Sequence, residues 1–353
     1  MERILITGAA GFIGAALAKR LVEDENNICY GVDNLNSYYD PGLKEYRLKK
    51  IEEKKKGENW HFVKGNIADK EFISSLFDEV KPTIVVNLAA QAGVRYSIEN
   101  PEVYIESNIV GFFNILEACR HTPNLKHLVY ASSSSVYGSN SKIPYSTDDK
   151  VDNPVSLYAA TKKSNELMAH AYSKLYNIPS TGLRFFTVYG EAGRPDMAYF
   201  SFTNKLRENK DIEIFNYGNC KRDFTYVSDI VEGIIRVMNK APEKKIGDDG
   251  LFIPPYKVYN IGNNHPENLL EFVTILQEEL VRAGVLPSDY DFEAHKKLVP
   301  MQKGDVAITY ADVSELERDF GFKPKTTLRE GLRKFATWYK EYYGGNEWEI
   351  LKI

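Results

Sequence analysis

The 353-residue sequence has no hydrophobic run long enough to cross a membrane, because a spanning helix needs roughly eighteen or more apolar residues. The chain begins with a strand-like segment, Arg3-Ile4-Leu5-Ile6, and not with the basic and apolar pattern of a signal peptide. We therefore expect a cytoplasmic protein that does not associate with membranes.

Cysteine and histidine are also scarce. The three cysteines, Cys29, Cys119 and Cys220, are odd in number and far apart, which argues against a disulfide framework or a zinc site. The six histidines form no ligand cluster such as H-E-x-x-H. We expect a reduced protein with no metal.

The sequence lacks an excess of positive charge. Its formal net charge is -4, whereas nucleic-acid binders are usually basic. The lysine run at residues 49–56 is interrupted by Glu52 and Glu53, which favours a solvated helical face. We expect no nucleic-acid partner.

The first half of the chain alternates short apolar runs with amphipathic segments. Continuous apolar runs are typical of strands buried on both faces, and a β-α-β-α alternation predicts a mostly parallel sheet covered by helices. The sequence thus predicts a doubly wound Rossmann-type α/β fold with a smaller mixed α/β domain. Strands are expected at 3–7, 28–32, 60–63, 83–88, 126–131, 180–185 and 257–261, and helices at 12–24, 70–80, 101–121, 156–176, 266–283 and 327–343. The main domain is expected over 1–187 and 226–262, and the smaller one over 188–225 and 263–353.

A glycine-rich turn follows the first expected strand. Gly8, Gly11 and Gly14 have the spacing G-x-x-G-x-x-G, and Asp33 ends the second strand. Glycines there permit a tight turn close to a pyrophosphate, and the acid accepts hydrogen bonds from the adenosine ribose while repelling a 2′-phosphate. This pattern predicts NAD over NADP. We expect the protein to purify with NAD(H), and Asp33→Ala together with an added arginine to relax the preference for NAD.

A second pattern combines Tyr158 and Lys162, which lie four residues apart on an expected helix and so share one face. A nearby ammonium would lower the pKa of the tyrosine from about 10 towards neutrality and make it a general base. The serines 132–135 follow the fifth strand, where hydroxyls reach the ligand crevice of an open sheet. The serine run is therefore expected to belong to the active site.

Together and in this order, these motifs resemble the extended short-chain dehydrogenases/reductases of the NAD-dependent epimerase/dehydratase family, from end to end. The resemblance implies a catalytic group of Tyr158, Lys162 and Ser133. It also implies NAD contacts from Gly8, Gly11, Phe12, Ile13, Gly14, Asp33, Asn34, Asn66, Ile67, Leu88, Ala89, Ala90, Asn108, Tyr158 and Lys162.

Further segments, 91–97, 184–190, 193–198 and 221–227, look like those of the UDP-glucuronate 4-epimerases. The resemblance implies that Arg222 and Asp305 hold the nucleotide, although Gln302 replaces an arginine of some relatives. Ser134 stands where decarboxylating relatives carry an acid. The substrate contacts implied are Arg95, Ser134, Ser135, Thr187, Arg194, Arg222 and Asp305.

The expected activity is therefore 4-epimerisation of a UDP-sugar, with UDP-glucuronate favoured by the loop arginines, which suit a carboxylate. UDP-glucose or UDP-N-acetylglucosamine remains the alternative sugar. A decarboxylase or dehydratase, or a non-catalytic NAD-sensing protein, is a further alternative. The resemblance also implies a role in polysaccharide biosynthesis and a homodimer in which helices 101–121 and 156–176 pair through outward residues such as Phe112, Phe113, Leu116, Leu167 and Met168.

Overall fold

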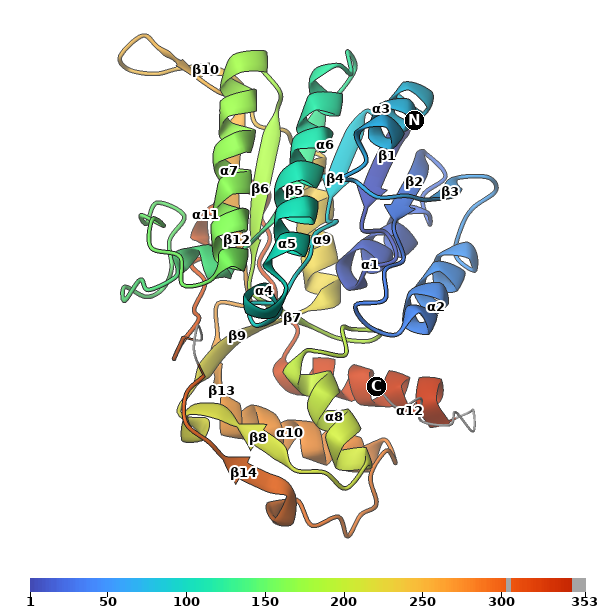
Figure 1. Ribbon diagram of the computed structural model, residues 1–353, viewed down its shortest axis with the longest axis vertical. Coiled ribbons are helices and arrows are strands. Elements are labelled where there is room, and N and C mark those ends of the chain that lie inside the picture. The colour runs from blue at the N-terminus through green and yellow to red at the C-terminus, as the bar shows by residue number, and fades with distance from the viewer. Residues whose placement is uncertain (303–305, 345–353) are drawn as a thin grey trace.

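Seven parallel strands form the central sheet of the computed structural model, which describes residues 1–302 and 306–344 (Figure 1). In spatial order they are β12 (Tyr256–Ile261), β6 (Ser180–Phe185), β5 (His127–Ser133), β4 (Ile84–Asn87), β1 (Glu2–Thr7), β2 (Asn27–Asp33) and β3 (Trp60–Lys64). Every neighbouring pair is parallel. The chain order reverses between β1 and β4, and ligands of such sheets bind where the strands end at that point. The predicted doubly wound fold is confirmed.

Helices cover both faces of the sheet. One face carries α1 (Phe12–Leu21), α2 (Pro41–Glu52) and α9 (Val227–Met238), and the other carries α3 (Lys70–Val80), α6 (Gly111–Arg120) and α7 (Leu157–Tyr176). Side chains of a strand point alternately to opposite faces. Accordingly Ile4 and Ile6 of β1 join the core beneath α1 and α9, whereas Leu5 joins the core beneath α3, α6 and α7.

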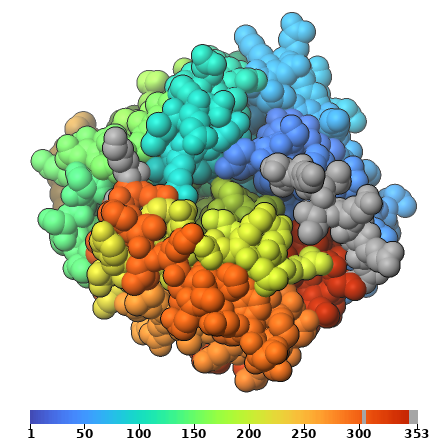
Figure 2. Space-filling model, turned by 60° about the horizontal axis from the view of Figure 1, so that its bottom comes forward, coloured from blue at the N-terminus to red at the C-terminus, as the bar shows by residue number. Residues whose placement is uncertain are grey.

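The rest of the chain forms a smaller unit at the carboxyl ends of the strands, at the bottom of Figure 1. It contains a three-stranded sheet in the order β13-β9-β7 and a parallel pair of β14 with β8. Figure 2 shows this unit in yellow to orange, against the blue to teal N-terminal half. Its elements are β7 (Thr187–Tyr189), α8 (Ala198–Arg207), β8 (Ile212–Ile214), β9 (Lys221–Tyr226), β13 (Pro266–Asn268), α10 (Leu269–Arg282), β14 (Lys296–Leu298) and α12 (Leu328–Gly344).

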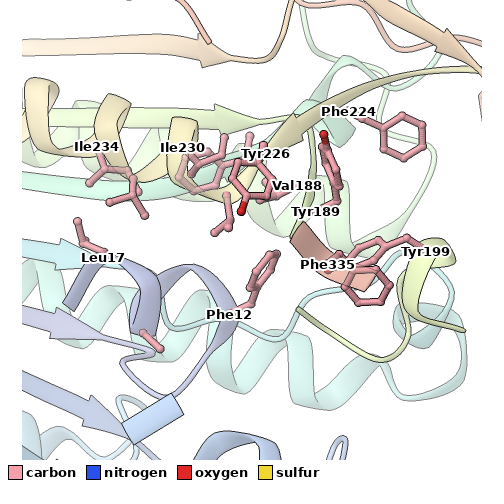
Figure 3. Close-up of a cluster of buried hydrophobic side chains, with 14 of the residues drawn as sticks. Phe12, Leu17, Val188, Tyr189, Tyr199, Phe224, Tyr226, Ile230, Ile234 and Phe335 are labelled. Carbon is pink, nitrogen blue, oxygen red and sulfur yellow. The ribbon is translucent and has the colours of Figure 1, made fainter. Parts of the chain in front are cut away.

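A continuous apolar core joins the smaller unit to the sheet. Leu17 of α1 lies towards Ile230 and Ile234 of α9 (Figure 3), and all three side chains are fully buried. The same cluster continues through Phe12, Val188 and Tyr226 to Tyr189, Tyr199, Phe224 and Phe335. Burial of this kind stabilises by about 25 cal/mol per Å² of apolar surface, so the two units are held together by the core itself.

The remaining elements are short. They are α4 (Tyr96–Glu99), α5 (Pro101–Tyr104), the hairpin of β10 (Lys245–Ile246) with β11 (Phe252–Ile253), and α11 (Ser314–Phe320). Short 3₁₀ segments lie at Ser134–Tyr137, Phe215–Gly218 and Glu293–His295. Among the described residues, every helix is too short or too polar to traverse a lipid bilayer.

The structure corrects several predicted elements. The single helix predicted at 101–121 is α5, then a π-helix over Ile105–Val110, then α6. Helix α1 ends at Leu21 rather than at residue 24, and helices α8 and α9 were not predicted. Helix α9 and strand β12 lie on the main sheet. The predicted domain boundaries at 187, 226 and 262 stay a prediction.

Candidate active site

The loop after β1 requires glycine at each of its three predicted positions. Gly8 has a φ of +69°, and a Cβ on it would lie 2.8 Å from the backbone nitrogen of Ala89. A Cβ on Gly11 or Gly14 would lie 2.9 or 2.1 Å from the carbonyl oxygen of Gly8. Gly11 is the N-cap of α1, and no side chain caps this helix. The first N–H groups of α1 therefore remain available to an anion such as a pyrophosphate.

A cavity runs from this loop along the carboxyl ends of β1, β2, β4 and β5. Its walls include all but one of the predicted NAD contacts: Gly8, Gly11, Phe12, Ile13, Gly14, Asp33, Asn34, Asn66, Ile67, Leu88, Ala89, Ala90, Tyr158 and Lys162. The exception is Asn108, which is buried behind the wall. Its side chain accepts from the N–H of Gln91 (2.8 Å) and donates to the carbonyl of Gln91 (3.0 Å) and to Thr161 (3.0 Å). The cavity, its glycine cradle and its acidic end fit a dinucleotide.

Asp33 lies at one end of this cavity and is held by two backbone N–H groups. Its carboxylate accepts from Ala10 (3.2 Å) and from Leu35 (2.8 Å). These bonds fix the carboxylate at the edge of the phosphate loop, where the predicted ribose contact requires it.

Tyr158, Lys162 and Ser133 all line the same cavity. Ser156 caps α7 by accepting from the N–H of Ala159 (3.1 Å), so the tyrosine lies in the first turn of the helix. Lys162 is buried and donates to the carbonyl of Ala131 on β5 (2.9 Å). Burial lowers the pKa of Lys162 to about 8.

The predicted lowering of the Tyr158 pKa by Lys162 is wrong for this structure. Burial raises the pKa of Tyr158, because an ionised phenol loses solvation there. The groups that favour the phenolate are the Ser133 hydroxyl, through a hydrogen bond, and the Arg194 guanidinium, through its charge.

The serine run alternates between two environments. Ser132 points into the protein and donates to Glu166 (2.7 Å), whereas Ser133 faces Tyr158. The next two residues, Ser134 and Ser135, line a second cavity. The structure thus places Ser133 beside the tyrosine, as predicted.

Four of the predicted substrate contacts gather in this second cavity: Ser134, Ser135, Thr187 and Arg222. Thr187 comes from β7, and Arg222 comes from β9, which pairs with β7. The guanidinium of Arg222 donates to the carbonyls of Lys221 (3.0 Å) and Ala307 (3.2 Å). The cavity is rich in hydroxyls and contains a cation, a composition that suits a phosphorylated sugar.

The other three predicted substrate residues lie elsewhere. Arg194 lines the first cavity, where its Nε donates to Asp196 (3.0 Å). Arg95 is exposed, lines neither cavity, and lies over the ring of Phe215 with its guanidinium carbon 5.0 Å from the ring centre. Its contact with substrate stays a prediction. Asp305 lies outside the described residues.

A buried ion pair behind the catalytic residues was not predicted. Glu166, on α7, forms two hydrogen bonds with Arg184 of β6, at 2.8 and 2.9 Å, and both side chains are 3% exposed. Arg184 also donates to the Tyr137 hydroxyl (3.0 Å), which donates to Asn260 (2.7 Å). The network fixes the helix of Lys162 against the ends of β5 and β6. Only the spacing of four residues between Lys162 and Glu166 hinted at it.

Arg47 of α2 was also missed, and it connects three segments. Its guanidinium donates to the carbonyls of Ala10 (2.9 Å), Ala192 (2.8 Å) and Gly193 (2.9 Å). Ala10 belongs to the phosphate loop, whereas Ala192 and Gly193 precede Arg194. One buried side chain therefore joins the two loops that form opposite parts of the first cavity.

The sequence profile of the NAD dependent epimerase/dehydratase family matches residues 4–262. The chain belongs to this family, and its cofactor is NAD. Among curated proteins, Protein CapI of Staphylococcus aureus is 54% identical over 347 residues, which cover 97% of this chain and 99% of that protein. UDP-glucuronate 4-epimerase 4 of Arabidopsis thaliana is 45% identical over 350 residues, 98% of this chain and 76% of its own length.

Solved structures of epimerases share the fold over nearly the whole chain. The UDP-glucuronic acid 4-epimerase of Bacillus cereus, in complex with UDP-glucuronic acid and NAD, superposes with a TM-score of 0.82 at 29% identity, covering 96% of this chain and 99% of that one. The UDP-glucose 4-epimerase of Thermotoga maritima, with UDP-glucose, gives a TM-score of 0.79 at 27% identity, with the same coverage.

Proposed function

We propose that this protein, an NAD-dependent nucleotide-sugar 4-epimerase, interconverts UDP-glucuronate and UDP-galacturonate. The observation that carries the choice of sugar is the position of Arg194. Its guanidinium lies in the catalytic cavity and is close enough to favour the Tyr158 phenolate by its charge. This guanidinium, which an ion pair with Asp196 holds in place beside the reacting centre, supports the choice of a sugar that carries a carboxylate there.

The proposed roles follow from the two cavities. Tyr158, as phenolate, takes the proton of the sugar 4-hydroxyl, and Ser133 donates a hydrogen bond to the same oxygen. NAD, held by the first cavity, would supply the acceptor and donor for the hydride at C4. The 4-keto sugar turns about its link to the pyrophosphate while Arg222 and Asp305 hold the nucleotide. Tyr158 then returns its proton to the oxygen of the new epimer. In this scheme the predicted main domain, 1–187 and 226–262, holds the cofactor, and 188–225 with 263–353 hold the nucleotide.

The carboxylate creates a chemical hazard that the site must control. Oxidation at C4 of UDP-glucuronate makes a β-keto acid, which loses carbon dioxide when its carboxylate aligns with the carbonyl. We propose that Arg194, with the hydroxyls of Thr187, Ser134 and Ser135, holds the carboxylate out of that alignment. Thr187 and the two serines share one cavity wall, and Ser133, beside Tyr158, directly precedes that wall in the chain.

The first experiment compares UDP-glucuronate with UDP-glucose in parallel incubations, with the products resolved by NMR. We expect kcat/KM for UDP-glucuronate to be about 10- to 100-fold higher, the value of one charge-assisted hydrogen bond. Equal rates, or a faster reaction of UDP-glucose, would favour the neutral-hexose alternative.

A second experiment replaces Arg194 or Thr187 by alanine. Epimerisation of UDP-glucuronate should slow about tenfold or more, and a detectable fraction of the product should be 4-keto-pentose with carbon dioxide, because the carboxylate is no longer restrained. Arg194→Lys should also release some decarboxylated product, since lysine lacks the planar pair of donors. Full epimerase activity in both alanine variants without decarboxylation would rule out the restraint.

We also propose a homodimer formed through the outer sides of α6 and α7. The structure corrects the predicted interface, because Phe112 and Leu116 face the sheet, at 2% and 0% exposure. Exposed apolar side chains remain at Ile105, Val110, Phe113 and Leu167. Such a patch suits an isologous contact between two copies.

Light scattering at micromolar concentration should give about twice the chain mass of 40.2 kDa. Introducing charge with Leu167→Glu should shift the protein to the monomer, because a buried unpaired carboxylate opposes association. Leu298→Glu, on exposed β14, is the matched control and should remain a dimer. A monomeric native protein would contradict the interface.

A further inference from the structure

Lys44 is a buried lysine in the wall of the NAD cavity. It lies on α2, its residue is 4% exposed, and it lines the same cavity as Asp33, Asn34 and Asn36. Lysine is rarely buried unless its charge has partners. Here the ammonium donates to the carbonyl oxygen of Asn36 (2.8 Å) and to its side-chain oxygen (2.9 Å).

The surroundings of the Lys44 side chain act on its pKa in opposite directions. Burial lowers the pKa of Lys44, the Asp33 carboxylate raises it by Coulombic attraction, and Arg47 lowers it. The ring of Tyr39 also faces the ammonium at 5.0 Å from its centre. An ammonium has three N–H donors, and Asn36 accepts from two of them. One donor remains for an anion in the cavity.

This geometry bears on how the cofactor is selected. A 2′-phosphate on the adenosine ribose would lie beside the residue that binds the ribose hydroxyls, which is Asp33. At that end of the cavity the negative charge of Asp33 is accompanied by the positive charge of Lys44 and the amides of Asn34 and Asn36. Once Asp33 is removed, the remaining groups are those that bind phosphate.

We propose that Lys44 is a latent ligand for the 2′-phosphate of NADP, masked by Asp33. The carboxylate alone then excludes NADP, and its removal is sufficient to admit NADP without the added arginine that the sequence predicted. This proposal depends on the family's NAD cofactor and on the described cavity, and not on which sugar the enzyme takes.

The test is a competition for the cofactor site. Each protein is incubated with equimolar NAD⁺ and NADP⁺ in excess until the bound fraction is constant, and the bound dinucleotides are then extracted and separated by chromatography. The native protein should hold almost only NAD. Asp33→Ala should raise the ratio of bound NADP to NAD by about 100-fold, because it removes one repulsion and exposes one charge-assisted hydrogen bond.

Adding Lys44→Met to Asp33→Ala should lower the ratio of bound NADP to NAD again, by about tenfold or more. The matched control is Asp33→Ala with Lys50→Met, since Lys50 lies on the same helix, pairs with Glu53, and does not line the cavity. It should keep the ratio of Asp33→Ala. Asp33→Asn keeps the shape of the side chain and an acceptor for one of the two N–H groups, of Ala10 or Leu35, and so limits damage to the loop.

Two results would overturn the proposal. The first is an equal NADP ratio in Asp33→Ala with and without Lys44→Met. The second is that neither Asp33→Ala nor Asp33→Asn binds NADP, whether or not these variants still bind NAD. Each result leaves the native enzyme's reaction with UDP-glucuronate untouched, so it can be told apart from a failure of the proposed function.

Discussion

Tyr158→Phe should lower the rate of epimerisation by about 10³- to 10⁴-fold, the upper range for loss of a general acid–base group. The variant lacks the oxygen that accepts the proton of the 4-hydroxyl, so hydride transfer cannot begin. Neither epimer nor decarboxylated product should form. The ring itself remains, and the packing of Tyr104 edge-on against it, at 6.1 Å between ring centres, should be kept.

Product analysis by NMR and the content of bound NAD(H) measure this result together. Bound NAD(H) and the unfolding midpoint should match those of the native protein. Tyr176→Phe, an exposed tyrosine at the end of the same helix, is the control and should keep full activity. A loss of less than tenfold in Tyr158→Phe would assign the proton transfer to another group.

The second large effect concerns stability. Arg184→Met removes the bidentate partner of the buried Glu166 carboxylate and leaves it the Ser132 hydroxyl (2.7 Å) and the more distant Lys163 ammonium (3.5 Å), so it should lower the free energy of unfolding by about 3 kcal/mol. Burial raises the pKa of the Glu166 carboxyl. The hydrogen bond and the Coulombic attraction between Glu166 and Arg184 outweigh burial, so the pKa of Glu166 is lowered. Because the folded pKa is lowered, this contribution is present above the unfolded pKa near 4.5 and is lost as the pH falls through the folded value.

Urea unfolding at pH 7 measures the change. The double variant Glu166→Leu with Arg184→Met should lose much less than the single variant, because no charge stays buried. Arg236→Met breaks the exposed pair with Glu232 and should change the unfolding free energy by less than about 1 kcal/mol. A small effect of Arg184→Met would show that water reaches Glu166.

The parts of the site that the sequence predicted depend on short-range rules. Gly8, Gly11 and Gly14 are needed by one turn, and Tyr158 and Lys162 share a face through the helical repeat. The strand-end position of Ser133 follows from the parallel sheet. Each of these inferences involves residues within a few positions of one another, or strands whose order the fold fixes.

The parts that were missed depend on long-range packing. Arg184 and Glu166 lie on different elements, and apart from the spacing of Glu166 from Lys162 their local sequence does not distinguish them from a surface pair. Arg95 and Arg194 are both loop arginines. Arg95 lies over Phe215, outside the catalytic cavity, whereas Arg194 lines that cavity. The pKa of Tyr158 was misjudged because burial, which the sequence pattern does not reveal, outweighs the nearby charges.

The three carbonyls that Arg47 holds have a consequence for how long the dinucleotide resides on the enzyme. Ala10 is fastened twice, through its N–H to Asp33 and through its carbonyl to Arg47. The same guanidinium secures the stretch before Arg194. The bond of Ala10 to Asp33 does not involve the stretch before Arg194, so the phosphate loop would stay fastened at Asp33 even if the bonds of that stretch to Arg47 were broken.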